Sequence, residues 1–128
     1  MLRLHVLRKA ARKLDELVEY VAMTTMDQIR EFGQDIGREF RPERVLLFGS
    51  HVRGTATPDS DVDLLIVLPF QGKSVRTSVN IRLKLRPPFP VDLLVRSPEQ
   101  MRERLAMGDD FIREILQEGI VLYEAHDH

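Results

Sequence analysis

The sequence predicts an α/β (α+β) domain in which a small mixed β-sheet is flanked by helices. Three short apolar runs, Val45–Phe48, Val62–Leu68 and Val91–Val95, have the length of buried strands. Segments with apolar residues at helical spacing lie before, between and after these runs. The length of 128 residues and the hydrophobic content of 43% are typical of one domain, over residues 1–128, with one modest core.

The N-terminal part of the chain is expected to be helical over about residues 5–40. Residues 6–23 and 26–40 each place apolar side chains three or four positions apart, which predicts one or two amphipathic helices. Gly33 and Gly37 weaken the second segment by about 1 kcal/mol each relative to Ala, so a break or a close packing contact is expected there. The core of the domain then follows over about residues 43–124.

The first two strands are joined by a turn that starts at Gly49. This glycine stops the run Val45–Phe48, and a polar stretch rich in turn-forming residues leads to the second strand, Val62–Leu68. Beyond Asp63 that strand is apolar on both faces, which is typical of a strand in the middle of a sheet covered by helices. Asp61 and Asp63 are therefore expected at the rim of the sheet, where a ligand can reach them.

A helix and a third strand are expected next. Residues 73–86 have a mixed apolar pattern that favours a helix. The prolines of the stretch Pro87–Pro90 then impose an extended connection. The third strand, Val91–Val95, is interpreted as a second buried strand that begins, like the one before it, with an acid at the rim.

The C-terminal part is expected to hold two helices and a closing strand. Ser97–Gln100 has the sequence of a capping box, which predicts a helix over about residues 98–107. Asp109 starts another helix, which Gly119 ends before an edge strand at Ile120–Tyr123. The inward face of that second helix is expected to consist of Ile112, Ile115 and Leu116.

Composition excludes several classes of protein. The 19 basic and 20 acidic residues leave a net charge of -1, so neither nucleic acid nor an anionic membrane is expected as a partner. Cysteine is absent, which excludes disulfides and thiolate metal sites and suits a reducing compartment. No stretch approaches the roughly 18 apolar residues of a membrane span, and the basic N-terminus lacks the apolar core of a secretory signal. We expect a cytoplasmic protein.

Three aspartates carry the strongest functional signal. Asp61 and Asp63 are separated from the pair Gly49-Ser50 by ten residues, and Asp92 lies in the third strand-like run. Residues two apart on a strand share a face, with Cβ atoms roughly 6 to 7 Å apart. Paired catalytic cations lie about 3.5 to 4 Å apart, and Mg²⁺ prefers carboxylate and phosphate oxygens. The pattern predicts a two-metal site for attack on a phosphoryl group.

Each of these residues also has an ordinary structural explanation when it is taken alone. Asp61 is compatible with a turn cap, and an acid at the start of a strand is common. Arg53 is compatible with an ordinary surface residue. Taken together, three aspartates converging on one rim without a cation would repel one another, so the structural explanation requires a separate partner for each.

The stretch Leu47–Gly54, followed by Ser60–Leu64, resembles the signature of the polymerase-beta-like nucleotidyltransferase superfamily. In particular it is similar to the minimal nucleotidyltransferases of prokaryotes, whose pattern is Gly-Ser, ten residues, then Asp-x-Asp. The chain matches every fixed position of this pattern, and the resemblance covers about residues 25–124. It implies the fold of that superfamily and a nucleotidyl transfer that uses ATP and two Mg²⁺ ions.

The phosphate-binding roles implied by the resemblance fall on the loop after the first strand. Gly49 lets the backbone approach a polyphosphate, and Ser50 hydrogen-bonds its oxygens. Arg53 matches an arginine common in the family, and its guanidinium offers paired donors to phosphate. His51 departs from the family pattern, in which arginine or another basic residue is frequent at that position.

The resemblance makes Asp61, Asp63 and Asp92 the catalytic and metal-binding residues, with Asp92 also accepting the proton of the attacking hydroxyl. Minimal members of the family commonly act as antitoxins paired with a HEPN-domain toxin, and some transfer AMP to a tyrosine of that toxin. We therefore expect a protein adenylyltransferase in a hetero-oligomer with such a toxin. Two alternatives stay open: an adenylyltransferase of the aminoglycoside-modifying kind, and an idle antitoxin that acts by occlusion alone.

Overall fold

The computed structural model describes residues 23–126, and its centre is a four-stranded sheet in the order β3-β2-β1-β4. The central strand β1 (Arg44–Phe48) pairs antiparallel with β2 (Val62–Val67) and with β4 (Ile120–Glu124). β2 pairs in parallel with β3 (Val91–Arg96). The prediction of a small mixed sheet is confirmed.

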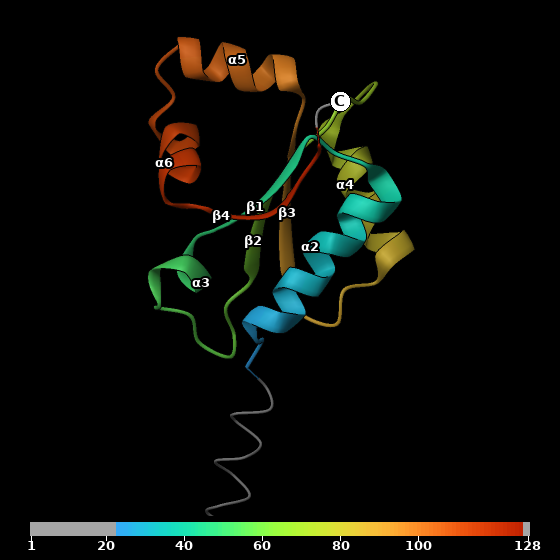
Figure 1. Ribbon diagram of the computed structural model, residues 1–128, viewed down its shortest axis with the longest axis vertical. Helices are drawn as coiled ribbons and strands as arrows, with labels where there is room; N and C mark the ends of the chain where they lie inside the picture. Colours follow the sequence, from blue (N-terminus) through green and yellow to red (C-terminus); the bar gives the residue numbers. More distant parts are fainter. Residues whose placement is uncertain (1–22, 127–128) are drawn as a thin grey trace, which may run out of the picture.

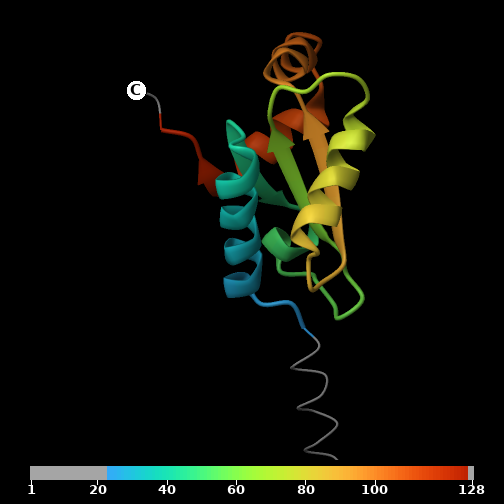
Figure 2. The same ribbon diagram turned by 90° about the vertical axis from the view of Figure 1, so that its right-hand side faces the viewer.

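Helices cover both faces of this sheet (Figure 1). α2 (Met26–Phe40) and α4 (Ser74–Leu85) lie side by side on one face, as Figure 2 shows. α5 (Pro98–Ala106) and α6 (Asp110–Glu118) lie on the other face. Most of the helix predicted over residues 6–23 lies outside the described residues. Within residues 23–126, no helix is long and apolar enough to cross a membrane.

The alternation of side chains along β2 divides the core into two clusters. Leu64 and Ile66 belong to the larger cluster, which lies under α2 and α4. Leu65 and Val67 point to the opposite face and join a smaller cluster with residues of α5 and α6. The prediction that this strand is central and apolar on both faces is therefore confirmed.

Close packing, rather than a break, explains the two glycines of α2. The helix runs without interruption through Gly33 and Gly37. A Cβ atom at Gly33 would lie 2.6 Å from the Cβ of Leu122, and one at Gly37 would overlap the ring of Tyr123. Both partners are residues of β4, so the glycines allow this helix to lie directly against an edge strand.

β3 corrects one prediction. The sequence predicts a buried strand, but β3 lies at the edge of the sheet and its residues alternate between buried and more exposed positions. Val91, Leu93 and Val95 join the core under α2 and α4, whereas Asp92 is exposed. The reason is that β3 has a partner strand on one side only, and on its second face Leu94 packs only partly buried against the smaller cluster.

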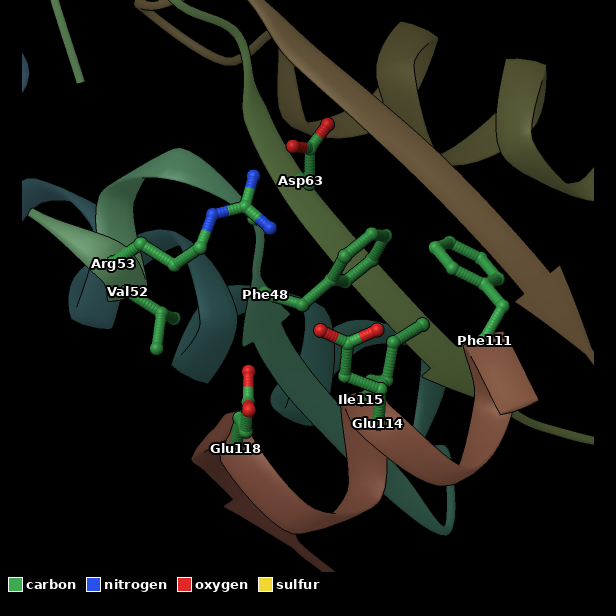
Figure 3. A pocket seen from close by; sticks show the side chains of 10 residues that line it. Phe48, Val52, Arg53, Asp63, Phe111, Glu114, Ile115 and Glu118 are labelled. Carbon is green, nitrogen blue, oxygen red and sulfur yellow. The ribbon is translucent and has the colours of Figure 1, made fainter. Parts of the chain in front are cut away.

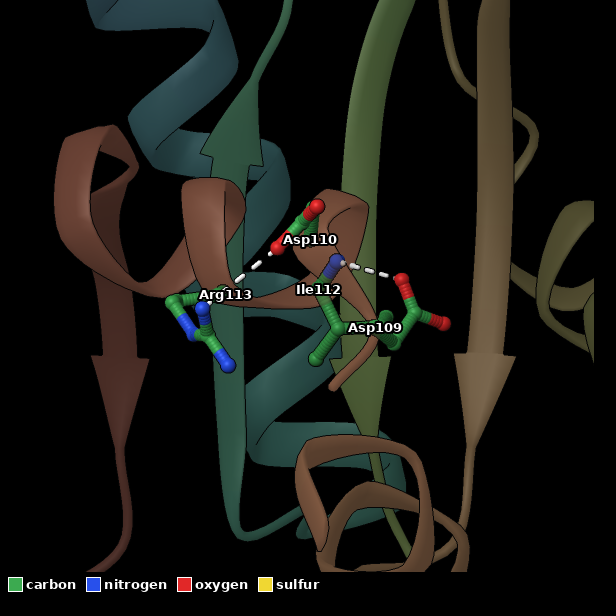
Figure 4. A network of polar contacts seen from close by, with 4 residues as sticks. All are labelled: Asp109, Asp110, Ile112 and Arg113. Atoms are coloured by element: carbon green, nitrogen blue, oxygen red, sulfur yellow. Dashed lines mark hydrogen bonds and ion pairs between the residues drawn. The ribbon is translucent and has the colours of Figure 1, made fainter. Parts of the chain in front are cut away.

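The start of α6 forms as predicted. The carboxylate of Asp109 accepts a hydrogen bond from the backbone N–H of Ile112 at 3.1 Å, and Asp110 pairs with Arg113 one turn later (Figure 4). Gly119 follows the last residue of the helix and leads directly into β4. The capping box predicted for α5 is also confirmed. The N-terminal caps therefore define where both helices on this face begin.

Candidate active site

The predicted aspartates meet at one end of the sheet. Asp63 and Asp92 are each the second residue of their strand, and they lie directly opposite each other in the parallel register of β2 and β3. They share the α5/α6 face, because the next residues, Leu64 and Leu93, point into the core under α2 and α4. Asp61 immediately precedes β2, as it precedes the predicted strand Val62–Leu68.

Gly49 brings the Gly-Ser part of the motif into contact with Asp63. Its φ of 80° and ψ of -149° fall in a region that only glycine occupies readily. A Cβ atom at this position would overlap the carboxylate of Asp63, whose Cγ would lie only 3.2 Å away. The carbonyl oxygen of Gly49 accepts hydrogen bonds from the amides of Val52 and Arg53, both at 3.1 Å, which turns the chain into α3 (Ser50–Arg53). The Gly-Ser and Asp-x-Asp parts of the motif therefore touch.

The short helix α3 presents hydrogen-bond donors beside this contact. Ser50 and His51 begin the helix, and the first N–H groups of any helix have no carbonyl in a preceding turn to bind. Nδ1 of His51 is buried and has no hydrogen-bond partner within the described part of the chain. Arg53 is exposed and forms no ion pair with any of residues 23–126. Such donors and a guanidinium are suited to phosphate oxygens.

The surroundings of Asp63 disfavour its negative charge. Burial raises the pKa of its carboxyl most, and the charges of Asp92 and Asp61 raise this pKa further. His51 and Arg53 act in the opposite direction and lower the pKa of Asp63. Asp92 and Asp61 therefore each lie close enough to Asp63 to disfavour its negative charge, and a cation bound at Asp63 would relieve that repulsion.

The donor set fits a hard divalent cation such as Mg²⁺, since Asp61, Asp63 and Asp92 supply only carboxylate oxygens. Proteins usually hold Mg²⁺ through one or two carboxylates together with substrate phosphates, rather than in a complete protein cage. In residues 23–126, no three His, Cys, Asp or Glu side chains gather closely enough to form such a cage. The fit at this end of the sheet therefore requires nucleotide phosphates as additional ligands.

A pocket of roughly 190 Å³ opens next to Asp63 (Figure 3). One wall is formed by the loop after β1, and the other is formed by α6. The residues that line it are Phe48, Gly49, Val52, Arg53, Asp63, Phe111, Glu114, Ile115, Glu118 and Gly119. Figure 3 shows Arg53 extending from α3 toward the Asp63 side, with the glutamates of α6 on the opposite side. Asp92 does not line this pocket; it lines a separate hollow between α4 and β3, the strand at the edge of the sheet.

The α6 wall is the part of the site that the sequence analysis missed. Phe111, Glu114, Ile115 and Glu118 follow the spacing i, i+3, i+4, i+7, which places them on one side of a helix. This spacing was visible in the sequence. The predicted inward face included only apolar residues, and so it omitted the two glutamates beside Ile115.

The comparison with known families is decisive for identity. Residues 26–122 match the model of the nucleotidyltransferase domain, a range that contains Gly49, Ser50 and all three aspartates. The chain belongs to the nucleotidyltransferase family. This nucleotidyltransferase is 32% identical over 97 residues to a protein of Methanocaldococcus jannaschii named "Putative protein adenylyltransferase MJ0604". The aligned region covers 74% of this chain and 94% of that protein.

Two solved structures share the fold of this nucleotidyltransferase. One is described as "a putative nucleotidyltransferase from Sulfolobus solfataricus"; it has a TM-score of 0.52 and 18% identity, and covers 77% of this chain and 78% of that one. The other is a toxin-antitoxin with AMP-PNP, which has a TM-score of 0.53 and 19% identity over 76% of this chain and 74% of that one. At these identities the likeness shows the fold alone, and the predicted nucleotidyltransferase fold is confirmed.

Proposed function

We propose that this nucleotidyltransferase transfers AMP from ATP to a hydroxyl of a partner protein, in a Mg²⁺-dependent reaction at Asp61, Asp63 and Asp92. One observation carries the proposal: Gly49 lies against the Asp63 carboxylate, and Asp92 lies directly opposite on the neighbouring strand. Groups suited to phosphate and groups suited to a cation are therefore adjacent. The relationship to the M. jannaschii protein, named as an adenylyltransferase of proteins, supports this choice of reaction.

In the proposed reaction the residues of the site have separate roles. The backbone N–H and hydroxyl of Ser50 donate hydrogen bonds to phosphate oxygens, and Arg53 donates paired bonds to the same phosphates. Asp92 accepts the proton of the attacking hydroxyl. The oxygen of that hydroxyl bonds to the α-phosphorus while the bond from the α-phosphorus to the leaving pyrophosphate breaks. Asp61, Asp63 and Asp92 would hold Mg²⁺ together with the nucleotide phosphates, and the ion would polarise the α-phosphate and stabilise the leaving pyrophosphate.

We infer that the acceptor is a tyrosine of a HEPN-domain toxin and that the protein acts as its antitoxin. The similarity of the Gly-Ser and Asp-x-Asp motif to that of the minimal nucleotidyltransferases supports this partner. A structure that shares the fold is a toxin-antitoxin with AMP-PNP, which supports both an antitoxin role and ATP as the donor.

The outer face of α4 supports a protein partner of this kind. Val75, Val79 and Leu83 are 62%, 45% and 69% exposed, and their spacing of four residues places them in one apolar stripe. Residues 73–86 contain several basic residues and no acidic one. This face suits a partner helix that carries apolar and acidic side chains, and we assign it to the toxin.

The test uses the full chain, ATP labelled at the α-phosphate, Mg²⁺ and a candidate HEPN-domain toxin. The expected result is label on a tyrosine of the toxin, located by mass spectrometry. Asp63→Asn should abolish labelling, because it removes the central carboxylate. Asp59→Asn makes the same chemical change in the exposed turn before β2, so it should label normally.

Two outcomes would contradict the proposal. Undiminished labelling by the Asp63→Asn variant would exclude this site. Equal neutralisation of the toxin by the Asp63→Asn variant and the unaltered protein, without label, would favour inhibition by occlusion.

A further inference from the structure

The pocket beside Asp63 has two chemically different walls. The loop wall contributes the backbone at Gly49 and the guanidinium of Arg53. The α6 wall contributes the ring of Phe111 and the carboxylates of Glu114 and Glu118 (Figure 3). Within the described residues, neither glutamate forms an ion pair with Arg53 or with any other cation. The two walls are therefore suited to different parts of one ligand.

Charge determines which part of a nucleotide suits the α6 wall. Phosphates would be repelled by Glu114 and Glu118, since like charges at close range are unfavourable. An ionised carboxylate only accepts hydrogen bonds, so these residues favour a neutral group that presents N–H or O–H donors. Phe48 and Phe111 add apolar surface for a flat ring; they pack edge to face with centroids 5.7 Å apart.

The volume of the pocket limits how much of the ligand it holds. Roughly 190 Å³ is less than the about 300 to 1,000 Å³ of sites that enclose a drug-sized molecule. The pocket therefore holds one ring system with part of a sugar, but not a whole nucleoside triphosphate. Gly49 and Asp63 line the same pocket, which makes it continuous with the proposed phosphate and metal site.

We propose that the α6 wall binds the nucleoside end of the donor nucleotide and that Glu114 and Glu118 recognise the amino group of adenine. This inference rests on the proposed nucleotidyltransferase function, and it specifies ATP as the donor nucleotide that the protein prefers. The exocyclic amino group of adenine donates N–H bonds that a carboxylate accepts. A purine without that group leaves the carboxylates without a partner on the base.

The test compares the binding of two nucleotides to the full chain by calorimetry, in the presence of Mg²⁺. The ligands are ATP and purine riboside triphosphate, which lacks only the amino group. ATP is expected to bind about tenfold more tightly, as a hydrogen bond to a charged group contributes at least this much. The double variant Glu114→Ala, Glu118→Ala should bring the ratio of the two affinities to about one.

A matched control separates this effect from a change in overall charge. Glu99 and Glu103 are exposed and four residues apart on α5, outside the pocket. The double variant Glu99→Ala, Glu103→Ala removes the same charge from exposed positions four residues apart on the neighbouring helix. It should keep the tenfold preference for ATP.

The outcomes distinguish this inference from the function on which it rests. Equal binding of the two nucleotides by the unaltered protein would overturn the inference and leave the proposed transfer reaction intact. A preference for ATP that survives in the Glu114→Ala, Glu118→Ala variant would also overturn it. So would a variant that loses only the binding of the cationic aminoglycoside kanamycin and keeps its binding of both nucleotides. If neither nucleotide binds, the nucleotidyltransferase proposal fails together with the inference.

Discussion

The two faces of the sheet are covered to different extents. Under α2 and α4, the larger buried cluster extends over all four strands, from Val91 on β3 to Leu122 on β4. Under α5 and α6, the strand residues buried in the smaller cluster come from β1 and β2 alone, and at the sheet end that carries Asp63 and Asp92 only the partly buried Phe48 packs against it. The first face thus provides most of the buried apolar surface, and the second leaves an end of the sheet open for a ligand.

The position of Asp63 follows from this asymmetry. A carboxylate under the covered face would lose its water without gaining a partner, which is costly. At the open end it is only partly buried, and its raised pKa reflects both that burial and the neighbouring Asp92 and Asp61. Substitutions on the covered face should therefore change stability, whereas substitutions at the open end should change binding and transfer.

Apart from substitution of the aspartates themselves, the largest effect is expected for Gly49→Ala. The side chain would overlap the Asp63 carboxylate and hold a backbone conformation that costs roughly 1 to 3 kcal/mol for other residues. Nucleotide affinity and transfer should each fall about tenfold or more, since the overlap displaces a group on which both depend. Gly54→Ala is the control, because Gly54 also has a positive φ, of 76°, but nothing within 4 Å of its Cβ position. Equal losses of affinity in the two variants would show that backbone strain alone is responsible.

On the covered face, Gly33→Ala should lower stability by about 1 to 3 kcal/mol, measured by urea unfolding. Alanine favours a helix by about 1 kcal/mol over glycine, but here its Cβ would meet the Cβ of Leu122, which cannot move away without shifting β4. The transfer rate well below the unfolding temperature should not change. Arg30→Ala, at an exposed position of α2, should stay within about 0.5 kcal/mol. A stabilised Gly33→Ala variant would mean that the contact with β4 relaxes freely.

The exposed stripe of α4, formed by Val75, Val79 and Leu83, allows a test of partner binding that alters neither the buried core nor the pocket beside Asp63. Leu83→Glu should weaken association with the proposed toxin partner about tenfold, since it replaces an apolar contact with a charge that an acidic partner repels. Leu83→Lys should weaken it less, because the new charge has the opposite sign. Both variants should retain stability within about 0.5 kcal/mol, as Leu83 is 69% exposed. Equal affinities for the two variants would exclude an acidic partner surface.

The smallest effect concerns pH in the absence of divalent cations. The pKa of Asp63 in the folded protein lies above 3.8, its ordinary value. Between the two values the folded state binds more protons than the unfolded state, so this group lowers stability as pH rises from 3.8 through its raised pKa. The Asp63→Asn variant has no carboxyl at this position and so does not lose this stability. The thermal stability of the variant minus that of the unaltered protein should therefore rise with pH over that window. A constant difference across the window would contradict the raised pKa.

Features with local signals in the sequence were predictable. The capping box at Ser97 depends on four consecutive residues, and the apolar run of β2 itself indicates that both faces are covered. A similar box at Thr25 and Gln28 was also readable, although the sequence analysis did not identify it. The Gly-Ser and Asp-x-Asp spacing pointed to the same loop and strand that the structure brings into contact at Gly49.

Features that depend on how distant segments pack were not predictable in this way. The run in β3 resembles that of β2, but β3 lies at the edge because the strand order gives it a single partner strand, which no local pattern reveals. The sequence spacing places the glutamates of α6 on one side of a helix, but it does not indicate that this side lies against the loop at Gly49. That placement is set by the packing of Ile112 and Ile115 on the sheet and by the entry of the chain into β4.

The junction at Gly119 fixes the distance between the two walls of the pocket. No loop separates α6 from β4, and a Cβ at Gly119 would lie 3.0 Å from the carbonyl oxygen of Leu47 on β1. β1 ends at Phe48, immediately before Gly49, so a single pair of strands carries both sides of the pocket beside Asp63. The distance between those two sides is set by the backbone pairing of β1 and β4 and does not depend on the side chains that line the pocket. Related chains can therefore exchange cavity residues, and with them the molecule recognised, while the framework keeps its dimensions.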